Sequence, residues 1–285
     1  MAKFLFLECE EGRGYDLLYG SCWAWKIASE IRNLGHEVIE VKRPLPEDAT
    51  DAIRRYKPDV VWFVGHGWCC LTTLEKVKLW ISTPKDFCLL FGKRTRGCSE
   101  RKNEDVLAGT VTNALSCLTG QYLGEYLTKE RGCIAYMGYY EPFFFIRIKG
   151  QDKECACAQG DCRVSGVRKE VLRKCLVCMM DANLQFCMGL AQGMTVNEAY
   201  EHSLRKFDEW ISDLESIEPA TDREKFFIKL AITVLHVDKK HQVVHGKLSH
   251  RLRVVARHPM QFAIGMMGLP IMLGSLLQSL RRWKE

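Results

Sequence analysis

Three apolar runs near the start of the chain have the spacing of strands that alternate with helices. Residues 3–7 read KFLFL, residues 37–41 read EVIEV, and residues 58–67 read PDVVWFVGHG. Between these runs, residues 17–34 and 47–56 carry apolar side chains at helical spacing. This alternation is typical of βαβ units, so we expect an α/β fold with a mostly parallel sheet of about six strands and helices on both faces.

The middle of the chain continues the same pattern. We predict further strands over residues 111–116 and 133–137, with a helix over residues 118–131 between them. The FFFIRI run at residues 143–148 is expected to form an edge strand or a hairpin, and residues 241–246 a last short strand.

Two long segments do not fit a strand pattern. Residues 68–108 are irregular and contain a basic, glycine-bearing part, so we expect a long active-site loop over the carboxyl ends of the strands. Residues 166–237 are predicted to be helical. Within that part, Thr195 and Glu198 have the spacing of a capping box at a helix start.

Positive charge is concentrated at the C-terminus. From Asp238 onward there are nine Lys and Arg against two acidic residues, although the whole chain carries only +6. The residues between Arg257 and Arg281 include no Asp, Glu, Lys or Arg. The concentration of positive charge in the tail favours an anionic partner such as a membrane surface or nucleic acid, and a solvated basic end is the alternative.

The C-terminal segment is therefore predicted to be separate from the folded body. We expect one domain over residues 1–255 and an apolar, basic-flanked tail over 256–285. Residues 258–285 have three placements open to them: docking on this chain or on a second copy in an oligomer, lying on a membrane surface, or spanning a membrane. We expect no nucleic-acid partner.

The cysteine content bears on the compartment. The first apolar run turns acidic at once, which is a poor signal peptide, and the chain has fourteen cysteines. In a cytoplasmic protein these would be reduced thiols, metal ligands or catalytic groups, and most would be small buried side chains. We therefore expect a cytoplasmic protein, with membrane association through the tail left open.

Two predicted strand ends carry a histidine and a cysteine. His66 and Gly67 end the third apolar run, and Cys117 follows the strand at 111–116. Parallel sheets gather functional groups at the carboxyl ends of their strands. An imidazole that takes the thiol proton makes cysteine a nucleophile, and the N–H groups of Gly67 and Cys117 could hold an oxyanion. A helix starting at Leu118 would lower the pKa of the Cys117 thiol.

The two blocks together resemble a known family. VVWFVGHG, followed by ALSCLTGQYLGEYLTKERGCIAYMGY, is similar to the paired blocks of caspase-like (clan CD) cysteine peptidases, nearest to their prokaryotic gingipain-like and CHAT-like branch. The resemblance covers about residues 3–253. It implies the three-layer caspase–hemoglobinase fold, and a hydrolase in which His66 and Cys117 form a catalytic dyad that cleaves protein or peptide substrates without a cofactor.

The same resemblance suggests where a substrate side chain would be recognised. The loop after the first strand and the residues around the cysteine strand would line the pocket for the side chain before the cleaved bond. An acidic pocket would favour arginine or lysine there, whereas acids that are merely solvated would not. The candidate residues are Glu8, Glu10, Asp16, Ser116, Tyr139 and Glu141.

The remaining cysteines offer a metal site as an alternative. Cys155, Cys157, Cys162 and Cys178 could supply thiolates to zinc, although the C-x-C-x4-C spacing is not a usual one. Disulfides and free thiols are the other two interpretations. We expect no metal, with this zinc site as the weaker alternative. We also expect no bound nucleotide, since neither a P-loop nor a complete GxGxxG motif is present.

Two other function classes stay open beside the peptidase. The first is a catalytically silent caspase-like scaffold that acts through its tail at a membrane or a partner. The second is a receiver-like or flavodoxin-like binding domain. That class needs an acidic cluster or a phosphate loop at the strand ends, and the sequence offers neither in convincing form.

Overall fold

The computed structural model confirms the α/β architecture expected from the sequence. It describes residues 1–8, 16–42, 46–64, 66–68, 71–73, 81–82, 104–146 and 163–252. For some residues inside its strands and helices only the backbone is described, among them residues 66–68. The described residues from Ala2 to Leu252 belong to one compact unit.

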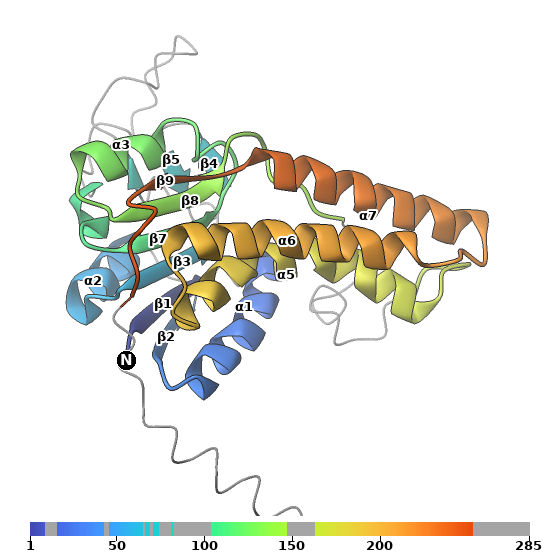
Figure 1. The fold of residues 1–285 in the computed structure, drawn as a ribbon, viewed down its shortest axis with the longest axis horizontal. Helices are drawn as coiled ribbons and strands as arrows, with labels where there is room; N and C mark the ends of the chain where they lie inside the picture. Colours follow the sequence, from blue (N-terminus) through green and yellow to red (C-terminus); the bar gives the residue numbers. More distant parts are fainter. Residues whose placement is uncertain are drawn as a thin grey trace, which may run out of the picture. The chain divides into compact units, whose positions relative to one another are not determined.

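A six-stranded sheet forms the centre of this unit (Figure 1). Its order is β2-β1-β3-β7-β8-β9; neighbouring strands are parallel except for β8 and β9, which are antiparallel. The sheet is therefore mostly parallel, as predicted. The strands are β1 (Lys3–Glu8), β2 (Glu37–Lys42), β3 (Val60–Val64), β7 (Val111–Leu115), β8 (Ala135–Tyr139) and β9 (Gln242–Gly246).

Six α-helices in the described part cover the sheet in a three-layer arrangement (Figure 1). On one face, α1 contacts β1 to β3 and packs against α5, which in turn packs against α6 and α7. On the other face, α3 contacts β8 and β9. A short 3-10 helix, η2 (Glu104–Leu107), contacts both α3 and α2. The helices are α1 (Asp16–Asn33), α2 (Pro46–Tyr56), α3 (Leu123–Glu130), α5 (Lys169–Ala191), α6 (Val196–Glu215) and α7 (Asp222–His241).

The central strands are buried on both faces, which explains their continuous apolar sequences. Every residue of β3 and β7 is buried, and the Phe6 ring of β1 lies 5.4 Å from the Trp62 ring of β3. A parallel sheet covered by helices on both sides requires such runs instead of alternating polarity. The predicted capping box is also confirmed, because the Thr195 hydroxyl accepts from the Glu198 N–H and the Glu198 carboxylate accepts from the Thr195 N–H.

Three elements differ from the sequence-based expectation. The third apolar run is split: β3 ends at Val64, and His66–Trp68 form β4 of a separate antiparallel sheet with β5 (Leu71–Thr73) and β6 (Ile81–Ser82). The helix expected from residue 118 begins at Leu123. Residues 143–146 of the FFFIRI run are neither strand nor helix, because β7 and β9 occupy both edges of β8.

The domain boundary near residue 255 stays a prediction, because the tail lies outside the described residues. Among the helices that the structure describes, none combines the length and the apolar character that crossing a bilayer requires. The zinc alternative is largely untested as well, since Cys155, Cys157 and Cys162 also lie outside the described residues. Within the described part, no group of three or more His, Cys, Asp or Glu side chains is arranged to hold a metal ion.

Candidate functional site

The hydrogen-bond register between β3 and β7 relates the two predicted catalytic positions. The strands are adjacent and parallel, and Val60 pairs with Val111 while Val64 pairs with Leu115. Each pair is separated by 51 residues, and so are His66 and Cys117, which follow Val64 and Leu115 by two residues each. His66 and Cys117 therefore follow adjacent strands at the same edge of the sheet, each two residues after the last paired residue of its strand.

Cys117 opens a tight turn between β7 and α3. The next residue, Leu118, has φ 62°, in the left-handed region that a residue with a Cβ enters at a cost of about 1–2 kcal/mol. This backbone conformation is incompatible with a helix starting at residue 118. Strained residues of this kind persist only where the surroundings determine the conformation, and they are common beside functional groups.

Hydrogen bonds to β8 and β9 hold this turn. The Gly120 N–H donates to the Tyr139 carbonyl at 2.9 Å, and the Gly120 carbonyl accepts from His245 Nε2 at 2.6 Å. Gln121 Nε2 donates to the Tyr140 carbonyl at 2.7 Å. These partners are distant in sequence, so the turn that carries Cys117 is fixed by tertiary contacts.

The Cys117 thiol is half-buried, whereas the other four described free cysteines are buried. Burial raises the pKa of the Cys117 thiol, and the charge of Asp238 adds to that rise; hydrogen bonding from the Phe143 backbone and from its own backbone opposes it. The expected lowering by a helix start is therefore wrong, because the turn at Leu118 replaces the first turn of that helix.

The remaining described thiols are poor candidates for a nucleophile. Burial raises the pKa of Cys133, Cys175 and Cys187 to about 12, and it also raises the pKa of Cys178 well above its ordinary value. Cys178, one of the proposed zinc ligands, is a free thiol buried within α5. A thiol that is both buried and protonated is neither a nucleophile nor a ready metal ligand.

The proposed substrate-binding residues fall into three groups. Ser116 and Tyr139 are buried, and Tyr139 accepts a hydrogen bond from Asn183 at 2.9 Å, so neither side chain lies open to a substrate in this structure. Glu141 is half-buried just after β8. Glu8 ends β1 and Asp16 begins α1, but their side chains, like all of Glu10, lie outside the described residues.

Sequence reasoning missed one residue near the cysteine, Asp238 of α7. This carboxyl group is fully buried, and its Oδ1 accepts from the Phe144 N–H at 2.9 Å. Burial raises the pKa of Asp238 well above its usual range. A signal was present in the sequence, because Ile228, Ala231 and Leu235 precede it at helical spacing and are buried.

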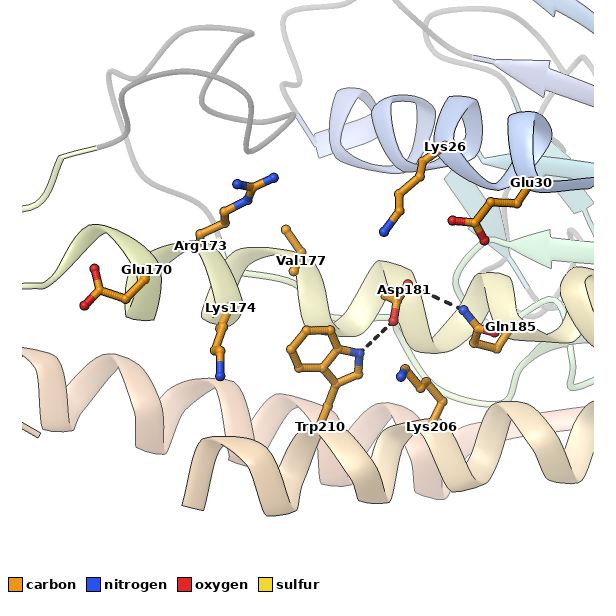
Figure 2. A pocket seen from close by; sticks show the side chains of 10 residues that line it. All are labelled: Lys26, Glu30, Glu170, Arg173, Lys174, Val177, Asp181, Gln185, Lys206 and Trp210. Atoms are coloured by element: carbon orange, nitrogen blue, oxygen red, sulfur yellow. Dashed lines mark hydrogen bonds between the residues drawn. The ribbon is translucent and has the colours of Figure 1, made fainter. Parts of the chain in front are cut away.

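A separate hollow of about 560 Å³ lies among α1, α5 and α6 (Figure 2). On one of its walls, Trp210 Nε1 donates to Asp181 Oδ2 at 2.9 Å and Lys206 lies over the Trp210 ring. Lys174, which also lines it, is paired with Asp213. Helices alone line the hollow, with basic and acidic side chains intermixed, and Cys117 is not among them.

No protein-family model matches the chain, and no curated protein sequence matches it either.

Proposed function

We propose that the chain is a caspase-like cysteine endopeptidase in which His66 and Cys117 form the catalytic dyad. One observation carries the proposal: β3 and β7 are paired at an offset of 51 residues, which is also the separation of His66 and Cys117. Groups that follow adjacent parallel strand ends by equal numbers of residues are what a shared cleft requires, and this supports the proposal. The resemblance of the sequence blocks around them supports the same assignment.

The chemistry would proceed through an acyl-enzyme. The Cys117 sulfur attacks the peptide carbonyl carbon while His66 takes the thiol proton, and the N–H groups of Gly67 and Cys117 stabilise the oxyanion. His66 then gives the proton to the leaving amine, which leaves a thioester. Water, deprotonated by His66, attacks the thioester, and release of the new carboxylate restores the thiol.

The raised pKa of Cys117 adds a condition to this mechanism. A thiol with a raised pKa carries little negative charge near neutral pH, so the proton must leave as the substrate is attacked. We therefore propose that His66 acts as a general base during attack, and that a resting thiolate–imidazolium pair is not the main ground state.

Substrate preference and location complete the proposal. We propose arginine or lysine before the cleaved bond, because the acidic residues Glu8, Glu10 and Asp16 follow one another in the sequence from the carboxyl end of β1. We propose a cytoplasmic protein that reaches a membrane surface through residues 258–285. The second candidate function is a catalytically silent scaffold of the same fold, which is favoured by the burial that raises the pKa of the Cys117 thiol.

Two substitutions test the dyad. Cys117→Ala and His66→Ala should each lower the turnover of fluorogenic peptides with Arg or Lys before the reporter by at least about 1000-fold. Cys133→Ala is the matched control, because that thiol is fully buried beside the same sheet and should leave turnover near the wild-type level. Full activity in Cys117→Ala would refute the peptidase proposal. A purified wild-type chain that cleaves no such peptide and is not labelled by a thiol-reactive peptide probe would favour the scaffold.

A further inference from the structure

The segment that follows β8 lies between Cys117 and the end of α7. Its start is tied to α7 by the Tyr140 N–H, which donates to the His241 carbonyl at 2.7 Å. Four residues later the Phe144 N–H donates to Asp238 Oδ1 at 2.9 Å. Between these anchors the segment has no regular secondary structure, so individual contacts determine where its backbone runs.

Side-chain packing explains only part of this placement. Phe143 is buried, with its ring 4.8 Å from the Tyr139 ring, whereas Phe144 is 46 % exposed. The Phe144 side chain thus makes little core contact that could fix its backbone. The hydrogen bond from its N–H to Asp238 fixes it instead.

A buried carboxyl group is a costly acceptor for a single amide. The Asp238 side chain is fully buried, and its second oxygen has no hydrogen-bond partner among the described residues. A neutral side chain such as asparagine would accept the same N–H without the cost of burying an ionisable group. An unsatisfied buried group of this kind calls for an explanation beyond packing.

The neighbouring amide provides that explanation. Phe143 immediately precedes the residue that Asp238 holds, and the start of the same segment is joined to the Cys117 turn by the Gly120 N–H, which donates to the Tyr139 carbonyl, and by Gln121 Nε2, which donates to the Tyr140 carbonyl. Burial raises the pKa of Cys117, and the Phe143 backbone opposes that rise. Fixing the Phe144 N–H therefore also fixes the backbone that reaches Cys117. A donor to a thiolate is effective only while its position is maintained.

We propose that Asp238 is a positioning residue for Cys117, acting through the Phe143–Phe144 backbone that its carboxyl group holds. It touches no substrate in this role. The catalytic importance of this positioning rests on the proposed function, whereas its effect on the pKa of the Cys117 thiol does not. Other titratable groups whose pKa responds to Asp238 are Tyr139 on β8 and Cys178 on α5, besides Cys117 itself.

The test is the pH dependence of Cys117 alkylation by iodoacetamide in the full chain. Trypsin releases Cys117 in the peptide 103–129, which contains no other cysteine, and Cys133 in the peptide 132–147. Mass spectrometry of the first peptide gives the rate at each pH and hence the apparent pKa. Labelling of the second reports loss of the fold, because Cys133 is fully buried and its pKa is about 12.

Asp238→Asn and Asp238→Leu form the matched pair. Both remove the ionisable group, but only asparagine keeps an oxygen that can accept from Phe144. We expect the apparent pKa of Cys117 to be about one pH unit higher in Asp238→Leu than in Asp238→Asn, roughly a ten-fold loss of thiolate at a given pH. Equal pKa values in the two variants, with Cys133 unlabelled in both, would overturn the proposal.

A second substitution covers the case in which Asp238→Leu does not fold. Phe144→Pro removes the N–H donor and leaves the carboxyl group in place, so it should raise the pKa of Cys117 in the same direction. An unchanged pKa in folded Phe144→Pro would refute the positioning role. Peptidase activity is a separate readout: if no variant cleaves peptides but the Asn–Leu difference persists, the proposed function fails while the positioning role stands.

Discussion

Gly120 allows the strongest stability prediction, because the turn after Cys117 lies directly against the sheet there. A Cβ added at Gly120 would lie 2.4 Å from Val243 Cγ2 and 3.0 Å from the Tyr139 carbonyl carbon. Real Cβ atoms do not approach so closely, and the backbone of β8 cannot give way cheaply. We expect Gly120→Ala to lower the free energy of unfolding by about 2 kcal/mol, within the usual range for overpacking of about 1–3 kcal/mol.

Val243 supplies the control for this prediction. It is half-buried on β9, and Val243→Ala alone should cost about 1 kcal/mol through lost burial. In the Gly120→Ala background the same change removes the nearest clash. The double variant should therefore be about 1 kcal/mol more stable than the sum of the two single effects, with the contact to the Tyr139 backbone accounting for the remaining loss.

Urea unfolding followed by tryptophan fluorescence would measure all three variants. A loss of about 2 kcal/mol corresponds to a fall in melting temperature of roughly 4–8 °C for a chain of this size. Strict additivity would show that Val243 and Gly120 do not interact as the structure describes. A Gly120→Ala variant as stable as the wild type would refute the close packing of the turn on the sheet.

Two further predictions concern charge. Arg168 lowers the pKa of Glu224 to about 2 through side-chain hydrogen bonds. This carboxylate should therefore stabilise the fold above its unfolded pKa of about 4.5 and lose that effect as the pH falls toward 2. The difference in unfolding free energy between wild type and Glu224→Gln should shrink over that interval, and a difference independent of pH would contradict this. The basic tail should bind vesicles that contain anionic lipid and release them at high salt, whereas a chain ending at Arg257 should not float with them; equal flotation of both chains would exclude the tail as the anchor.

The fold could be predicted from the sequence because its main signals are local. The apolar runs of β1 and β3, and the capping box at Thr195, depend on residues within a few positions of one another. Such patterns predict the same local structure in any tertiary context, since burial on both sheet faces and helix capping always require the same residue types. The element order followed from these patterns.

The turn at Cys117 could not be predicted in the same way. Residues 118–131 carry apolar side chains at spacings that favour a helix, but Gly120 forms its hydrogen bonds with Tyr139 and His245, which are far away in the sequence. Those bonds hold the turn that precedes α3, which begins at Leu123. Burial of the thiol in this turn raises its pKa, opposite to the direction expected from a helix start. The segment after β8 was misjudged for a related reason, because its apolar residues say nothing about which sheet edges are already occupied.

The shared register of β3 and β7 has a consequence for how such a chain can change length. Because β3 and β7 are paired along their lengths, the residues between Trp68 and Glu104 can be lengthened or shortened without altering which residues follow the ends of these two strands. One residue inserted inside β7 would instead turn the side chains beyond it to the opposite sheet face. Related chains should therefore differ freely in the spacing of the two blocks, while the distance from each strand to its histidine or cysteine stays constant.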